Sequence, residues 1–429
     1  MHSKDVAEPY ALWPCWTVHL LITAGIFTVQ CGCTESAAPQ PDTAPAGVAD
    51  GSQRAGILPD SQGIYHVHEG QQIQAVLDAA AADPVHKHVM IHAGTYRPQY
   101  ASQAMIRFHA RHDGLLVEGE GRPVLTAENP AAALPGSTGY PAVVNHVVYF
   151  GDGVSERTTL RGFTITGAAG FVTQQETDGP IEPNADDTVL QKRLFFYLDG
   201  GAIKIFGQSS PVLDDLVIAD NTTQLCGGGI SVEHRGRPAG NVRILNCVFR
   251  NNRCPATGSA IDLLEGSSAE IENCLFVGNI ANSGMAAVEA QFGLRYNERH
   301  GCGALTVFPS SRATVVSCTF TQNWNGADDR GKSSYRNCIF WNNTASSGGL
   351  PGDPYELDVA STVQVQNCWI NGRINDLQGT VNAAENSLNA PDPLFDTDFT
   401  PQNPQYDGIG FRSPAQKDAT HVPAKNSGP

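Results

Sequence analysis

Four segments of this chain repeat one pattern: ILNCVFRNN (244–252), IENCLFVGN (271–279), VVSCTFTQN (315–323) and YRNCIFWNN (335–343). Each begins with an apolar or aromatic residue, has cysteine fourth and phenylalanine sixth, and ends with asparagine. LDDLVIADN (213–221), VQVQNCWI (363–370) and, more loosely, LRGFTITGA (160–168) follow the same frame. Successive cysteines of the pattern are 27, 44, 20 and 30 residues apart, so the repeat varies in length while its columns persist.

A second set of segments precedes these, each beside a glycine: GGAIKI (200–205), GGGISV (227–232), GSAIDL (258–263) and CGALTV (302–307). Their apolar residues alternate with variable ones, which is the side-chain period of a β-strand. Coils of three short strands, joined by loops of different size, explain constant columns in a repeat of variable length. The pattern predicts an all-β fold, a right-handed parallel β-helix of about ten to twelve coils over residues 62–415.

The cysteine and asparagine columns are expected to be structural. Residues in one column lie about 4.8 Å from the next coil, whereas a disulfide needs Cβ atoms about 3.8 Å apart. We therefore expect buried free thiols and an asparagine ladder that bonds neighbouring main chain at a coil corner. A bridge between Cys226 and Cys254, which precede glycine turns, stays open as an alternative. The histidines between residues 66 and 112 match no zinc-ligand spacing, and we expect no metal site.

The two ends of the repeat region resemble those of known β-helix proteins. QQIQAVLDAAAA (71–82) predicts an amphipathic helix that covers the first coil, and the strand and turn of HVMIHAGTYRP (88–98) follow it. With APDPLFDTDF (390–399) near the other end, the chain resembles the pectin-lyase-like superfamily. The resemblance implies a carbohydrate-related function. It assigns no catalytic residue, because the signature motifs of polygalacturonases and pectin methylesterases are absent.

Composition and the N-terminus indicate where the protein works. The net charge is −16 and no run of Lys and Arg occurs, which argues against nucleic-acid binding. Residues 16–29 are largely apolar and too short for a comfortable membrane span. We expect residues 1–33 to be an export signal, either an ordinary cleaved one or a lipoprotein-type one with lipid attachment at Cys33. A flexible linker (34–61) should follow it and, after the β-helix, a disordered tail (416–429). The expected protein is an extracytoplasmic monomer that contacts a membrane only through its lipid.

The candidate site follows from strand alternation in the second set of segments. Ile203 and Ile205 should face the core, so Lys204 should face out, and the same register turns Ser231, Asp262 and Thr306 outward. Groups capable of acid–base chemistry gather on this expected face, and we take as candidate catalytic residues Lys204, Glu233, His234, Arg235, Asp262 and Glu265. Aromatic residues beside them and the long insertion at 281–300 supply candidate substrate-binding residues: Phe206, Phe308, Arg295, Tyr296, Arg299 and His300.

Two classes of function fit this face. An exported protein that binds and cleaves an acidic polysaccharide would use Glu233 and Asp262 as a hydrolytic pair. Lys204 or Arg235 would be the base of a lyase, with Ca²⁺ on the acids as the only cofactor to consider; a uronan C5 epimerase would share that proton abstraction. The alternative is a non-catalytic surface, adhesion or structural module, favoured by the missing enzyme signatures.

Overall fold

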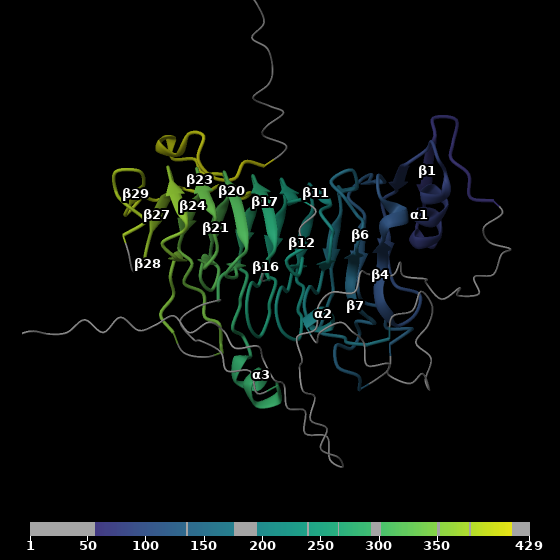
Figure 1. Cartoon of the computed structure of the whole chain (residues 1–429), viewed down its shortest axis with the longest axis horizontal. Coiled ribbons are helices and arrows are strands. Elements are labelled where there is room, and N and C mark those ends of the chain that lie inside the picture. The colour runs from purple at the N-terminus through teal and green to yellow at the C-terminus, as the bar shows by residue number, and fades with distance from the viewer. Residues whose placement is uncertain are drawn as a thin grey trace, which may run out of the picture.

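The computed structural model describes residues 56–133, 136–175, 195–237, 240–264, 266–292, 302–349, 352–376 and 379–413. Their short strands form three sheets, here called A, B and C, in which all neighbouring strands are parallel (Figure 1). Each coil passes from sheet C to sheet A to sheet B and then returns to sheet C one position along. This is the three-stranded parallel β-helix that the repeat predicts, with nine or ten strands per sheet in the described residues.

The strands are short, as the repeat requires. Sheet A contains β1 Ile64–Val67, β2 His88–Ile91, β5 Leu116–Gly119, β8 Thr159–Arg161, β11 Val212–Asp214, β14 Val242–Leu245, β17 Ser268–Glu272, β20 Arg312–Val316, β23 Ser334–Arg336 and β26 Gln364–Gln366. Sheet B contains β3 Thr95–Tyr96, β6 Val124–Thr126, β9 Thr164–Thr166, β12 Val217–Ala219, β15 Val248–Arg250, β18 Leu275–Val277, β21 Thr319–Thr321, β24 Ile339–Trp341, β27 Trp369–Asn371 and β29 Ser387–Leu388. Sheet C contains β4 Ser102–Phe108, β7 Val144–Phe150, β10 Ile203–Phe206, β13 Ile230–Glu233, β16 Ile261–Leu263, β19 Leu305–Val307, β22 Ala327–Asp329, β25 Leu357–Val359 and β28 Ile374–Asp376.

The corner between sheets A and B explains why asparagine or serine precedes each cysteine of the repeat. These cysteines, here called the ladder cysteines, are Cys247, Cys274, Cys318, Cys338 and Cys368. The preceding residue has left-handed backbone, with φ of 54° at Asn246, 52° at Asn273 and 53° at Ser317. Asparagine enters this region at lower cost than most residues, because its short polar side chain bonds locally. The sharp corner lets the next residue, the cysteine, point into the core: all five ladder cysteines are buried and free. The prediction of core thiols is confirmed.

The core is built from columns that run the length of the solenoid. Phe249, Phe276, Phe320 and Phe340 stack with ring centroids 5.0, 4.2 and 4.7 Å apart. At the corner between sheets B and C the asparagines form the expected ladder: Asn279 Nδ2 donates to Asn323 Oδ1 at 3.0 Å and to the Phe249 carbonyl at 2.9 Å. Buried amides that bond to each other and to main chain leave few polar groups unsatisfied.

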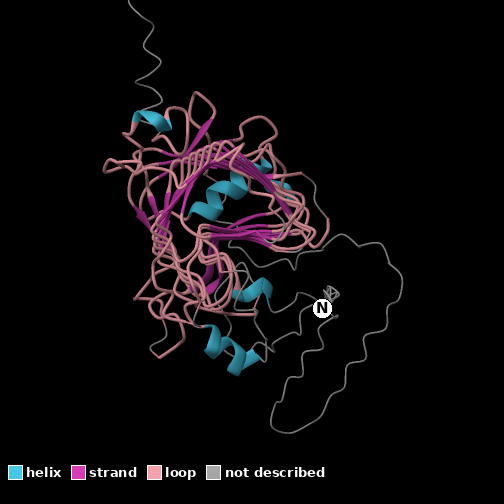
Figure 2. Ribbon diagram, turned by 90° about the vertical axis from the view of Figure 1, so that its left-hand side faces the viewer, coloured by secondary structure: helices cyan, strands magenta, loops and turns pink. Residues whose placement is uncertain are grey.

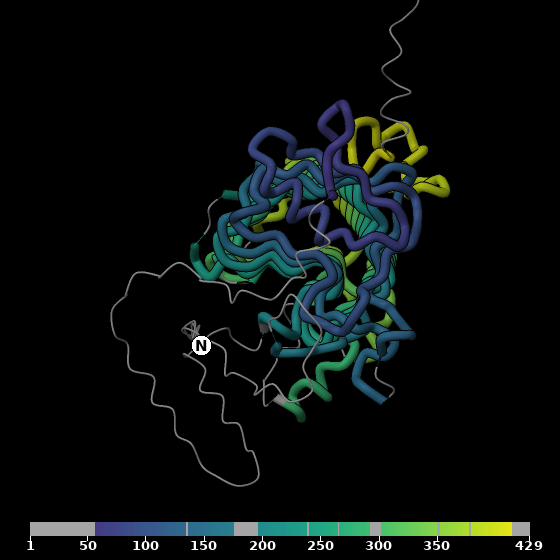
Figure 3. Tube along the Cα trace, turned by 90° about the vertical axis from the view of Figure 1, so that its right-hand side faces the viewer, coloured from purple at the N-terminus to yellow at the C-terminus, as the bar shows by residue number. Residues whose placement is uncertain are grey.

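A helix covers the N-terminal end of the core, and the C-terminal segment packs along sheet B. Helix α1 (Ile73–Ala82) turns its buried residues Ile73, Val76, Leu77 and Ala80 toward the first coils, and Figure 3 looks on to this end. A 3₁₀ turn follows at Ala110–His112, and a second one, Pro404–Tyr406, lies in the C-terminal segment. This segment returns over sheet B, where Phe411 packs with Leu275 and Val277. The predicted helix is therefore present and closes the solenoid as expected.

The outer side of sheet C is covered by a layer of loops. Helix α2 (Phe195–Leu198) packs Phe196 and Tyr197 on Tyr149 and Phe206 of sheet C. The loops that lead from sheet B to sheet C contribute Leu225, Cys226 and Ala256, and helix α3 (Met285–Phe292) packs against them. Figure 2, which looks along the solenoid, shows this layer beside the three sheets. None of the described helices is long and apolar enough to cross a bilayer.

Candidate functional site

The predicted column of outward side chains exists, but it is buried. Lys204 pairs in register with Ser231, then Asp262, then Thr306 on successive strands of sheet C. Lys204, Ser231 and Asp262 are fully buried, and Thr306 is 3% exposed. The expectation of a solvent-exposed face is therefore wrong. Strand alternation correctly gives the direction of each side chain, but it cannot show that loops from other coils cover that side.

Lys204 forms an ion pair under this layer. Its ammonium lies 3.0 Å from Glu233 Oε2 and donates to Ser231 Oγ at 3.1 Å. The other carboxylate oxygen of Glu233 accepts a hydrogen bond from Arg235 Nε at 3.1 Å, and the Arg235 guanidinium lies 4.8 Å from the ring centre of Phe206. Both oxygens of Glu233 thus contact cations.

His234 is also engaged on both sides of its ring. Its Nε2–H donates to the Ser209 carbonyl at 2.8 Å, and its Nδ1 accepts from the Ser268 backbone N–H at 3.3 Å. Burial lowers the pKa of His234 and favours the neutral ring. With neither nitrogen directed at solvent, His234 connects β13 to the start of β17.

Asp262 lies at the centre of a buried acidic cluster. Thr257 Oγ1 donates to Asp262 Oδ1 at 3.1 Å, and the Cys226 backbone N–H donates to Asp199 Oδ1 at 2.9 Å. Burial raises the pKa of Asp262 well above its usual range. The bridge between Cys226 and Cys254 that the sequence left open as an alternative is not formed, since both thiols are free.

The remaining predicted residues divide into two groups. Phe206 packs against Phe196 with ring centroids 4.6 Å apart and is buried, while Phe308 is partly exposed beside β19. Six predicted residues lie outside the described part of the chain: Cys33, Glu265, Arg295, Tyr296, Arg299 and His300. The structure thus brings buried Lys204, Glu233 and Phe206 together. Arg235, which is exposed, contacts Glu233 from the edge of this cluster.

A depression near the C-terminal coils contains one carboxyl group. Glu356 lies among lining residues that include Trp341, Asn342 and Arg373, and burial raises its pKa to about 7. Its Oε1 accepts from the Asn343 backbone N–H at 3.0 Å, and its Oε2 bonds to the Asn343 amide. Glu356 therefore ends the asparagine ladder. A glycosidase would need a second carboxylate across the bond, and the lining of this depression supplies none.

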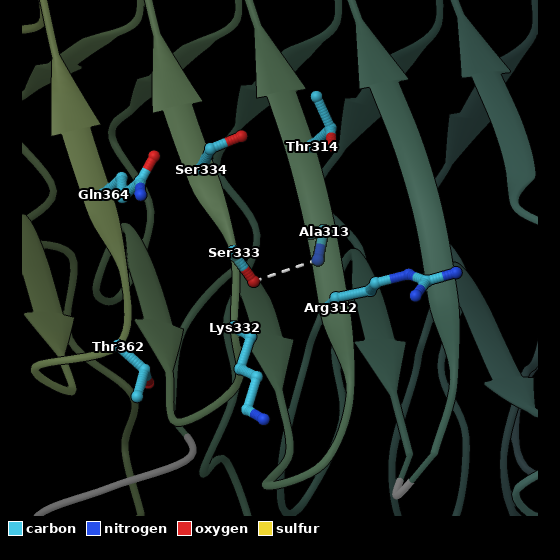
Figure 4. Close-up of a pocket in the computed structure, with 8 residues that line it drawn as sticks. All are labelled: Arg312, Ala313, Thr314, Lys332, Ser333, Ser334, Thr362 and Gln364. Atoms are coloured by element: carbon cyan, nitrogen blue, oxygen red, sulfur yellow. Dashed lines mark hydrogen bonds between the residues drawn. The ribbon is translucent and has the colours of Figure 1, made fainter.

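The second depression lies on the outer face of sheet A and is basic. Thr314, Ser334 and Gln364 form a row in register on β20, β23 and β26. Arg312 lies at the start of β20, and Lys332 and Thr362 lie in the turns two residues before the other two members of that row. Figure 4 shows these side chains on three neighbouring coils. Arg336, two residues beyond Ser334, is exposed on the same face. We call Arg312, Lys332 and Arg336 the basic patch; within the described residues none of their side chains has an acidic partner.

Sequence reasoning missed the basic patch, although a signal was present. Arg312, Lys332 and Thr362 each lie six residues before a ladder cysteine. Counting back from the cysteine column places them at equal positions on successive coils. The sequence-based prediction considered charged residues on the strands that form sheet C, and therefore did not include Arg312 and Lys332.

Comparison with known families agrees with the geometry. A search of curated proteins finds no match. A family model described as "Right handed beta helix region" matches residues 146–291 and 256–387. The combined region, 146–387, is more than half of the 429 residues. The chain therefore belongs to the right-handed β-helix family.

Proposed function

We propose that this protein is a non-catalytic β-helix module that binds an acidic polysaccharide across the outer face of sheet A. The observation that carries the proposal is the basic patch: two exposed cations on neighbouring coils, Arg312 and Lys332, beside a row of hydroxyl and amide groups. Guanidinium and ammonium groups pair with carboxylates, and hydroxyl and amide groups bond to sugar hydroxyls. Strands about 4.8 Å apart repeat these contacts along a polymer.

The net charge of −16 does not prevent this interaction. At physiological salt the screening length is about 8 Å, so a polyanion at the basic patch responds mainly to the charges nearest to it. Two acids of the preceding coil, Glu270 and Glu272, lie in register with Thr314 and Val316 of β20. Glu270 contacts Arg243 at 3.5 Å and accepts a hydrogen bond from Asn241 at 2.8 Å.

The burial of the predicted acid–base residues supports the non-catalytic half of the proposal. Lys204, Glu233, His234 and Asp262 are all under 10% exposed. A polysaccharide cannot reach these groups unless the loop layer opens. Their hydrogen bonds and ion pairs account for their positions as parts of the interface between sheet C and that layer.

The test is an affinity measurement on the full chain with polygalacturonate and, for comparison, an uncharged polysaccharide of similar length. Wild type should bind the polyuronate and release it as salt is raised. The double variant Arg312→Ala/Lys332→Ala should bind about 10–100-fold more weakly, from about 1.5–3 kcal/mol for hydrogen bonds to charged groups. Arg161→Ala is the matched control, because Arg161 lies on the same sheet four strands before β20, away from the basic patch, and pairs with Glu118.

Equal binding by wild type and the double variant would refute the assignment of the site. Equal binding of the charged and uncharged polymers would refute the acidic substrate class. We also propose that the module works outside the cytoplasm, since its N-terminal apolar stretch and Cys33 have the order of an export signal with a lipidation site.

A further inference from the structure

We propose that Asp199, Cys226 and Asp262 form a structural zinc site between sheet C and its loop layer, independent of polysaccharide binding. One ligand atom from each residue lies within 4.8 Å of the other two, and all three residues are buried. Zinc bonds of about 2.0–2.3 Å to oxygen and sulfur require separations below this limit. The three atoms are therefore close enough for one ion to contact all of them after small shifts.

The site carries polar atoms that lack partners. Asp199 Oδ2 and Asp262 Oδ2 are both buried and have no hydrogen-bond donor among the described residues. The other oxygen of each carboxylate accepts a hydrogen bond that orients it. Asp199 Oδ1 accepts from the Cys226 backbone N–H at 2.9 Å, and Asp262 Oδ1 accepts from Thr257 Oγ1 at 3.1 Å. This arrangement is typical of metal ligands, whose second atom is bonded by a group outside the coordination shell.

The charges in the cluster also call for a cation. Asp199 and Asp262 are both fully buried. The Lys204 ammonium contacts Glu233 and Ser231. The carboxylates of Asp199 and Asp262 thus share the Lys204 cation with Glu233. A bound divalent ion would stabilise the charged forms of Asp199 and Asp262.

The backbone brings the three residues together. On three successive coils, the outward-facing strand residue follows five positions after Asp199, Cys226 and Thr257, respectively. The first two of these are proposed ligands, and Thr257 bonds to the third ligand, Asp262. Gly258 approaches Asp262 so closely that a Cβ atom there would lie 2.6 Å from the Asp262 Cβ. Glycine at this turn is what permits Thr257 to reach the Asp262 carboxylate.

The donor set selects the metal. A thiolate with two carboxylates suits Zn²⁺, whereas Ca²⁺ and Mg²⁺ take oxygen ligands. The thiol of Cys226 must lose its proton on binding. The proton leaves to solvent as the Cys226 Sγ–zinc bond forms, so the step balances without any redox partner. Such an ion would fasten three coils to the loop layer.

The experiment uses the full chain, stripped of metal and reloaded with Zn²⁺ alone or with Co²⁺ as a spectroscopic probe. We expect one Zn²⁺ retained per chain, a thermal midpoint that rises with Zn²⁺ concentration, and a thiolate-to-cobalt charge-transfer band. The band should disappear in Cys226→Ser and persist in Cys274→Ser. Cys274 is the matched control because it is a buried free thiol of the core column, where its Sγ donates to the Glu272 carbonyl at 3.3 Å.

Two further variants keep the test decisive if a ligand variant fails to fold. Thr257→Val should fold and bind Zn²⁺ about 10–100-fold more weakly, as expected when a group that orients a ligand is lost. Asp262→Asn should lose stoichiometric Zn²⁺ and melt at a lower temperature than zinc-loaded wild type. The proposal is overturned if folded wild type retains no Zn²⁺ and shows no cobalt band. It is equally overturned if Cys226→Ser keeps the band, or if Asp262→Asn melts at or above the zinc-loaded wild type because the two acids share a proton instead.

Discussion

Replacing Lys204 by methionine removes the fully buried cation of the ion pair with Glu233, at nearly constant side-chain length. Breaking a buried pair from one side costs about 3–5 kcal/mol, because the other charge stays buried. Arg235 still contacts Glu233, so we expect the lower end, about 3 kcal/mol. The entropy of unfolding is about 2.1 cal/mol/K per residue. For the roughly 350 residues of the β-helix, the thermal midpoint should therefore fall by about 4 °C.

The assay is thermal unfolding of the full chain followed by circular dichroism. Lys332→Met is the matched control, because Lys332 is exposed and should change stability by less than about 0.5 kcal/mol. The double variant Lys204→Met/Glu233→Gln should recover part of the loss, since no charge is then left unpaired by the substitution. A Lys204→Met protein with an unchanged midpoint would refute the conclusion that Lys204 is a buried structural residue.

Three other predictions use the same unfolding assay or cell fractionation. Asn279→Ala, in the middle of the asparagine ladder, should cost about 3–5 kcal/mol, because it leaves two or more buried groups without partners; a cost below about 1 kcal/mol would contradict this. Burial raises the pKa of Asp329 from 3.8 to about 6, so the folded state binds the extra proton and stability should fall as pH rises from about 4 to 6, by up to about 3 kcal/mol. Asp329→Asn should lessen this fall, and an unchanged pH dependence would count against it. Cys33→Ser should move the protein from the membrane to the soluble fraction of the producing cells; identical fractionation would show that Cys33 is not lipidated.

Much of the fold was predictable, because every coil of a solenoid must meet the same local requirements of backbone conformation, core packing and hydrogen bonding. The corner before Cys247 needs left-handed backbone, and Asn246 supplies it with φ of 54°. The position of Cys247 must fit the core, and the ladder asparagine must satisfy main chain where the chain bends. These are short-range requirements, and each one leaves a column of similar residues in the sequence.

The state of the candidate site was not predictable in the same way. Lys204 and Asp262 do point out of the strands, as alternation requires. Their burial depends on α2 and on loops around Cys226 and Ala256, whose packing follows no period. The basic patch shows the converse. Arg312 and Lys332 are exposed because no described segment crosses that part of sheet A, and only the assembled coils reveal which face stays open.

The most direct test of the central claim is to incubate the full chain with the polyuronate that it binds and to follow unsaturated uronate and reducing ends together. We predict no product of either kind during an incubation in which binding is detected, and loss of that binding in Arg312→Ala/Lys332→Ala. Product formation by wild type that is abolished in a folded Lys204→Met or Asp262→Asn variant would contradict the account. It would show that the residues under the loop layer reach a substrate.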